Sequence, residues 1–269
     1  NACLNQMENF GNKLYNLVIA ARGALFKQGE LAELTYGAFN TAAEALIGRH
    51  EEIIDFTYPV GWHPKGQPIN STRPYPKREL LKKYQFLAFH DLAVNAIIRL
   101  VTIVEALLGD IVRAVVLKHP HKIGLKTKVP MQMVFEATSI EDVHLRATDS
   151  LLNELSYRSP AEFADEMKSL VGPNLLECPA FHKYVEIKAT RDIHIHNNGV
   201  ANEVYIRKAG THVRVRAGMA LPVDIRYFLE SYEACLQLTE WIEKELHERW
   251  YSSECEEEQR RVELQPRPA

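Results

Sequence analysis

The sequence predicts an all-α protein, with helices over most of its length and one short β-hairpin. Apolar side chains recur along most of the 269 residues at the three- and four-residue spacing of amphipathic helices. Residues 92–112 are apolar on nearly every side, which is typical of a helix inside a bundle or an interface. Residues 204–208 and 212–216 instead alternate with a period of two, which predicts two short strands joined across Ala209-Gly210.

The N-terminal part is predicted to be a helical extension followed by a long loop. Apolar spacing indicates one helix over residues 3–27 and a second over residues 31–54. Residues 57–77 contain repeated proline dipeptides, from Tyr58-Pro59 to Tyr75-Pro76. Because proline lacks a backbone donor and fixes φ, we expect no regular structure in this loop.

The later helices have recognisable beginnings and ends. They are predicted over residues 78–118, 139–157, 159–170, 179–196 and 224–250. Pro120 ends the first, and Ser159-Pro160-Ala161-Glu162 has the pattern of a capping box. We therefore divide the chain into an N-terminal extension with its Pro-rich loop, a helical bundle and a charged tail, at residues 1–80, 81–252 and 253–269.

Composition limits the classes of function. The formal charge is −3, so no overall field attracts nucleic acid, and any RNA contact requires a local basic patch. The four cysteines have no paired or metal-ligand spacing, which favours a reducing cytoplasm. Charged residues interrupt the apolar stretch near residue 100, so we expect no membrane span.

We expect neither a metal nor a cofactor. His119 and His121 are two positions apart, but no acidic or cysteine side chain lies near them in the sequence, and a metal site needs three or four ligands. No Gly-rich phosphate loop is present.

The densest chemistry lies in residues 191–199, Arg-Asp-Ile-His-Ile-His-Asn-Asn-Gly. Arg191 is permanently charged and can bind two phosphate oxygens at once. His194 and His196 titrate near neutral pH and can act as general acid or base. Asn197-Asn198-Gly199 is typical of a turn, so the helix should end after His196. An arginine and a histidine at a chain bend suit the handling of a phosphodiester.

The same residues also have a purely structural interpretation. Basic side chains in the last turn of a helix complement its dipole, and His196 could cap a carbonyl. On a regular helix Arg191 and His194 share a face, whereas Arg191 and His196 diverge by about 140°. If Arg191 and His196 act together, the helix must bend or end between them, or each must meet its partner across a two-fold axis.

Two further sets of polar residues accompany this stretch. Polar positions of the 78–118 helix form nearly one stripe, which either faces solvent or supplies Glu105 or Asn95 to orient Arg191. The predicted hairpin carries a dense basic patch, which is either a solvated face or a contact for a phosphate backbone. The residues of that patch are Arg207, Lys208, Arg214 and Arg216.

The run from Arg191 to Asn202 resembles the signature of HEPN-domain proteins, in which an arginine and a polar residue precede a histidine. Four residues separate Arg191 from His196, and Asp192 holds the polar position. Residues 197–202 resemble the continuation HNNGvvN of one branch of the family. Residues 101–112 resemble the upstream helix of that branch, and the likeness covers roughly residues 86–250.

The resemblance implies a HEPN-like helical bundle that forms a homodimer and cuts RNA without a metal. The arginine and histidine of such enzymes meet at the dimer interface. In this chain His196 would be the acid–base group, and Arg191 would clamp the non-bridging oxygens. Asp192 would orient either His196 or Arg191, and Asn197 would help to hold the phosphate. His194 is the rival for the histidine role.

The alternative is a non-catalytic binding or scaffold module, because many HEPN relatives bind a partner or a nucleic acid without cutting it. Such a module would belong to a phage-defence or toxin–antitoxin-like system, with an antitoxin or another protein as partner. In the toxins paired with a nucleotidyltransferase, a tyrosine usually follows the histidine by two positions. Asn198 stands there in this chain, which argues against that form of regulation.

Overall fold

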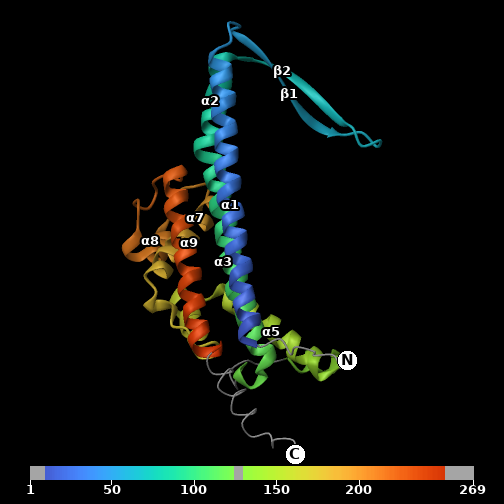
Figure 1. Ribbon diagram of the computed structural model, residues 1–269, viewed down its shortest axis with the longest axis vertical. Coiled ribbons are helices and arrows are strands. Elements are labelled where there is room, and N and C mark those ends of the chain that lie inside the picture. Colours follow the sequence, from blue (N-terminus) through green and yellow to red (C-terminus); the bar gives the residue numbers. More distant parts are fainter. Residues whose placement is uncertain (1–9, 124–129, 252–269) are drawn as a thin grey trace, which may run out of the picture.

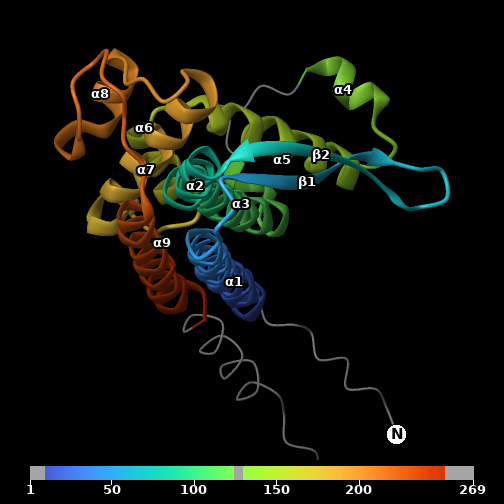
Figure 2. The ribbon, with the colours of Figure 1, turned by 90° about the horizontal axis from the view of Figure 1, so that it is seen from above.

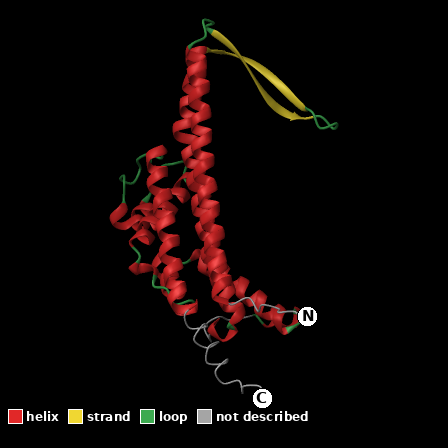
Figure 3. Cartoon of the chain, in the orientation of Figure 1, coloured by secondary structure: helices red, strands yellow, loops and turns green. Residues whose placement is uncertain are grey.

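The computed structural model describes residues 10–123 and 130–251, and this part of the chain is mostly helical, as predicted (Figures 1 and 3). The predicted tail at 253–269 lies outside it. Its helices are α1 Phe10–Ile47, α2 Lys77–Phe86, α3 Leu92–Lys118, α4 Met131–Glu136, α5 Ile140–Tyr157, α6 Pro160–Leu170, α7 Pro179–His196, α8 Glu203–Ala209 and α9 Ile225–Leu246. Its strands are β1 Ile53–Trp62 and β2 Pro68–Pro76. Among these residues, no helix combines the length and apolarity needed to cross a bilayer.

Helix α1 is one long helix, so the predicted break between residues 27 and 31 is wrong. Gly29 lies where the break was expected, and there the ring of Tyr232 on α9 comes so close that a Cβ would lie 3.0 Å from its Cζ. The helix continues because Leu25 before this point and Ala32 after it are both buried in the main core. Tertiary packing thus outweighs the local weakness of a glycine in a helix.

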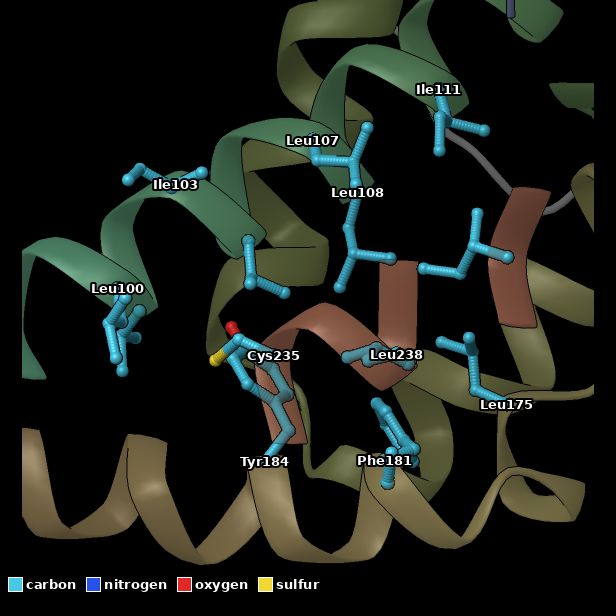
Figure 4. Close-up of a cluster of buried hydrophobic side chains, with 14 of the residues drawn as sticks. Leu100, Ile103, Leu107, Leu108, Ile111, Leu175, Phe181, Tyr184, Cys235 and Leu238 are labelled. Carbon is cyan, nitrogen blue, oxygen red and sulfur yellow. The ribbon is translucent and has the colours of Figure 1, made fainter. Parts of the chain in front are cut away.

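Helix α3 lies at the centre of the main core, which explains why residues 92–112 are apolar on nearly every side. It packs against α1, α5, α7 and α9. Figure 4 shows its side chains facing Phe181 and Tyr184 of α7 and Cys235 and Leu238 of α9. Burial raises the pKa of the Cys235 thiol to about 12, so this cysteine is a packing residue.

The proline-rich segment forms a two-stranded antiparallel ribbon, so the prediction of no regular structure there is wrong (Figures 1 and 2). Pro59, Pro74 and Pro76 all belong to one alternating set of cross-strand pairs. One position further along both strands, the Lys77 amide donates to the Glu52 carbonyl at 2.8 Å. Hydrogen-bonded and non-hydrogen-bonded pairs alternate along an antiparallel ribbon, so the prolines occupy the pairs that exchange no ladder bonds. A proline at such a position removes no hydrogen bond from the ribbon.

The helix predicted over residues 78–118 is present as a continuous run with an irregularity inside it. Helix α2 passes through a π-helical turn, Leu87–Asp91, into α3. The predicted capping box is also present, since Ser159 Oγ accepts from the Glu162 amide and the Glu162 carboxylate accepts from the Ser159 amide. The last predicted helix is confirmed as α9, which begins after Asp224 as its N-cap.

The hairpin predicted after the HEPN-like signature is wrong, because residues 203–209 form helix α8. Asn202 caps this helix by accepting a hydrogen bond from the Tyr205 amide at 3.0 Å. The helix buries Tyr205 and Ala209, one turn apart, in a small core with Ala189 and Ile193 of α7. Burial of this face outweighs the period-two alternation that suggested a strand.

Candidate functional site

Helix α7 carries the signature, and its last two turns have one covered and one open side. Ile187, Thr190 and Ile193 are buried. The open side carries Lys188, Arg191, Asp192, Ile195 and His196. We call this side the open face of α7. The helix ends at His196, as predicted, and the chain then turns with positive φ at Asn198 and Gly199.

Arg191 lies in a cluster of charged side chains that bridges three helices. Its Nη2 donates to Glu105 Oε2 of α3 at 2.7 Å, and Lys188 Nζ donates to the other oxygen of Glu105. Its Nε lies 3.1 Å from Asp192 Oδ1, in a geometry that makes no hydrogen bond. Lys208 Nζ of α8 donates to Asp192 Oδ2 at 3.3 Å. We call these five residues the Arg191 cluster.

The Arg191 cluster has a net charge of +1, because its three cations share two carboxylates. The side chain of Arg191 is 18% exposed and that of Lys208 is 37% exposed, so the cluster borders solvent. A phosphate oxygen could therefore reach these donors and take over part of the hydrogen bonding of the carboxylates. Glu105 thus contacts Arg191, whereas Asn95 donates to the Asp91 carbonyl instead.

The two histidines of the signature differ sharply in environment. The side chain of His196 is exposed and has no hydrogen-bond or ion-pair partner among the residues that the structure describes. The His194 Nε2 lies 3.1 Å from the Leu221 carbonyl, and its ring packs against Gly199, where a Cβ would lie 3.2 Å from His194 Cε1. His194 therefore joins the end of α7 to the returning chain, and His196 is the imidazole that is free for chemistry.

The environment of His194 predicts how the stability of the protein depends on pH. Burial lowers the pKa of His194, and the nearby His90 and Arg214 lower it further, although the contact with Leu221 opposes them. The unfolded chain therefore takes up a proton on His194 more readily than the folded protein does. We expect the stability contributed by neutral His194 to be full above about pH 6.5 and to decline as pH falls through the lower, folded pKa.

Thermal unfolding followed between pH 7.5 and pH 5 tests this expectation. The His194→Asn variant should show a flatter dependence of Tm on pH than the wild type. The His121→Asn variant changes an exposed histidine and should leave the dependence as it is. If the curves of Tm against pH were parallel for all three proteins, His194 would not be the source of the pH dependence.

Asn197 and the basic patch take positions that sequence reasoning did not foresee. Asn197 Nδ2 donates to the Val200 carbonyl, so its amide stabilises the turn. Arg207 and Arg216 are exposed, but Arg214 Nε donates to the buried Glu186 at 2.9 Å. With no hairpin present, the four predicted RNA-binding cations do not share the face of a strand pair.

Glu186 is the centre of a buried network that the sequence analysis missed. Its side chain is fully buried and accepts hydrogen bonds from Thr190, Tyr205, Tyr227 and Arg214. This network fastens the chain after α8 to α7, about two to three turns before the end of that helix. The available signal was a glutamate on the same helix face as Thr190 and Ile193, which predicts a buried charge in need of partners.

His90 is a second residue that the sequence analysis did not select. It lies on the π-helical turn before α3, where its ring stacks on Phe86 with centroids 5.0 Å apart. The His90 ring also lies 6.1 Å from the His194 ring, next to the end of α7. Residues 87–91 read as ordinary helix, so no sequence pattern marked this turn, although π-helical turns often occur at functional sites.

The structure shows no metal-binding constellation in residues 10–123 and 130–251. No three histidine, cysteine or carboxylate side chains gather there in a way that could hold a metal ion. The His119 ring packs against Phe10 and Trp250, and its centre lies 5.8 Å from that of the His121 ring.

Comparison with known proteins returns no relative of this chain. No protein-family model matches it, and searches of curated proteins and of solved structures also find no match. The residues that indicate a function are therefore those of the signature, in their arrangement at the end of α7.

Proposed function

We propose that this protein is a metal-independent endoribonuclease whose site forms between two copies of the chain. The observation that carries the proposal is the end of α7, which brings the cationic Arg191 cluster to the border of solvent and leaves the imidazole of His196 exposed. The resemblance of residues 191–202 to the HEPN signature supports the same function.

One chain alone does not bring the two groups together. Arg191 and His196 lie on one regular helix, about 140° apart around its axis and about 7.5 Å apart along it. If two α7 helices pack antiparallel across a two-fold axis near residues 193 and 194, Arg191 of each copy comes level with His196 of the other. Such an interface is self-complementary, as a symmetric dimer requires. Ile195, 45% exposed on the open face, would supply apolar contact between the two copies.

The chemistry requires little more than these groups. The 2′-hydroxyl of RNA is an internal nucleophile, so the site must remove its proton, stabilise charge on the phosphorus oxygens and protonate the leaving 5′ oxygen. His196 serves proton transfer, and the Arg191 guanidinium holds the non-bridging oxygens. Asp192 and Glu105 keep that guanidinium in place. The products are a 2′,3′-cyclic phosphate end and a 5′-hydroxyl end.

Incubation of the purified protein with mixed RNA in EDTA tests the proposal. The wild type is expected to cut, and both Arg191→Ala and His196→Ala should reduce the rate about 10²–10⁴-fold, which is the usual contribution of an acid–base group. His121→Ala removes another exposed histidine and should cut like the wild type. An inactive wild type, or activity that survives in both variants, would overturn the proposal.

A non-catalytic binding or scaffold module is the second candidate. The observation that favours it is the pairing of Arg191 with two carboxylates, Glu105 and Asp192, which is also the arrangement of a purely structural ion-pair cluster. The same assay separates the two functions, because a scaffold binds its partner but leaves RNA intact whichever variant is used.

A further inference from the structure

We propose that the β1–β2 ribbon is an arm that binds single-stranded RNA and leads it toward the end of α7. The class of ligand rests on the proposed function, but the binding itself is independent of cleavage. In Figures 1 and 2 the ribbon extends away from the helical bundle, joined to it through α1 and α2. A ten-residue strand spans about 33 Å, so the arm reaches well beyond the bundle.

The arm and its base have the opposite charge to the rest of the chain. Residues 48–86 contain seven Lys and Arg against four Asp and Glu, a net charge of +3. The whole chain carries −3, so the remaining residues together carry −6. The exposed cations of this segment are Arg49, Lys65, Arg73, Arg78, Lys82 and Lys83. This is the local basic surface that a chain of negative net charge needs in order to hold a phosphate backbone.

The tip of the arm presents flat aromatic surface beside these cations. The Trp62 side chain is 72% exposed, and it directly precedes a tight turn. That turn is closed by the His63 amide donating to the Gln67 carbonyl at 2.8 Å, and it holds Lys65. Further down the ribbon, the Arg73 guanidinium lies 5.7 Å from the centre of the Tyr58 ring. The exposed Trp62 ring beside Lys65, with the half-buried Tyr58 beside Arg73 behind it, is the kind of platform on which unpaired bases stack.

The basic surface continues from the arm toward the candidate site. Arg78, Lys82 and Phe86 are spaced four residues apart on α2 and therefore share a face. Phe86 stacks on His90, whose ring lies 6.1 Å from that of His194 near the end of α7. From Lys77 to His90 the helical run is about 20 Å long, which is a few nucleotides of extended chain.

The observations favour RNA over a protein as the occupant of the arm. Val60 and Ile69 are exposed near Trp62 and would suit a protein contact. However, the excess of cations extends along both the ribbon and α2, well beyond this apolar spot, and an extended polyanion uses all of it. A second copy of the chain docked on the arm is the competing outcome in the test below.

Fluorescence anisotropy with a labelled 20-nucleotide RNA of mixed sequence measures this binding. The full chain is used with His196→Ala and EDTA, so that the RNA stays intact. Trp62→Ala in this background is expected to weaken binding about tenfold, within the range for loss of one stacked base. Lys65→Ala with Arg73→Ala should reduce the slope of log K against log salt by about 1.4, since each phosphate contact contributes about 0.7.

Matched variants control for charge and for folding. Lys13 and Lys27 are exposed on α1, away from the arm, and their double alanine variant should keep the wild-type salt slope. A shortened arm, with residues 57–72 replaced by Asn-Gly, joins the paired positions Phe56 and Arg73 through a two-residue turn. It should bind as weakly as Trp62→Ala or more weakly.

The outcomes separate this inference from the proposed function. Weaker RNA binding in the arm variants supports the arm even if the wild type never cuts RNA. Unchanged RNA binding in these variants overturns the arm even if the wild type is an active nuclease. A change in sedimentation on removal of Trp62, with RNA affinity unchanged, would show a protein-binding arm and overturn the inference.

Discussion

Replacing Glu186 with Ala is expected to lower the free energy of unfolding by about 3 kcal/mol, the lower end of the range for breaking a buried ion pair. Glu186 is fully buried, and Arg214 Nε donates to it at 2.9 Å. The substitution would leave the guanidinium of Arg214, 20% exposed, without its anion. It would also remove the acceptor of the Tyr227 hydroxyl at 2.8 Å and of the Tyr205 hydroxyl at 3.0 Å.

Chemical denaturation followed by helical circular dichroism measures this effect. Glu186→Gln keeps an acceptor for the two hydroxyls and loses only the charge, so its loss of stability should be smaller than that of Glu186→Ala. Glu240 is an exposed carboxylate on α9, and Glu240→Ala should change stability by no more than about 0.5 kcal/mol. Equal stability of the Glu186→Ala variant and the wild type would show that the network does not hold the chain after α8.

The network also connects stability to the candidate site. Arg214 Nε and Nη2 donate to Glu186 and Thr190 of α7, and its Nη1 donates to the Pro222 carbonyl at 2.5 Å, so Arg214 joins both parts of the segment after α8 to α7. Lys208, which pairs with Asp192 beside Arg191, belongs to the helix that this segment follows. Loss of Glu186 should therefore loosen the Arg191 cluster as well as the fold.

Signals within a few residues of one another predicted the start of α6 and the end of α7 correctly. The capping box at Ser159 and the turn after His196 each depend on hydrogen bonds between residues that are close together in the sequence. For the same reason the end of α7, and with it the position of the signature residues, could be predicted.

The errors arose where distant residues decide local structure. Tyr232 packs on Gly29 from about two hundred residues away and α1 continues through the predicted break. The prolines of the ribbon fit only because each falls in a pair that exchanges no ladder bonds, and that register is set by both strands together. Residues 204–208 alternate like a strand, but Tyr205 meets Glu186 of α7 and the segment becomes α8.

In the candidate site, too, some contacts could be predicted from a sequence pattern and others depend on residues far apart in the sequence. The contact of Glu105 with Arg191 was suggested by the polar stripe on α3, because such stripes mark positions that can face a neighbouring helix. The partners of Glu186 lie as many as 41 residues away in sequence, so no local pattern identified them. The arrangement of two chains, which decides whether Arg191 meets His196, lies beyond any pattern within one chain.

An equal mixture of the Arg191→Ala and His196→Ala variants, refolded or expressed together, is expected to regain about a quarter of the wild-type rate of RNA cleavage. Random pairing makes half of the dimers mixed, and in each mixed dimer one of the two sites combines an intact Arg191 with an intact His196. Each variant alone should be about 10²–10⁴-fold slower than the wild type. The gain on mixing is therefore large enough to measure by release of labelled RNA fragments.

A second mixture decides between sites built from one chain and sites built from two. When the wild type is mixed equally with the double variant Arg191→Ala/His196→Ala, a shared site leaves only the wild-type dimers active, which is about a quarter of the full rate. A site within one chain would leave every wild-type subunit active and give about half. In that case the two single variants would also stay inactive together. A quarter in both mixtures is thus the signature of an arginine and a histidine that meet across the two-fold axis.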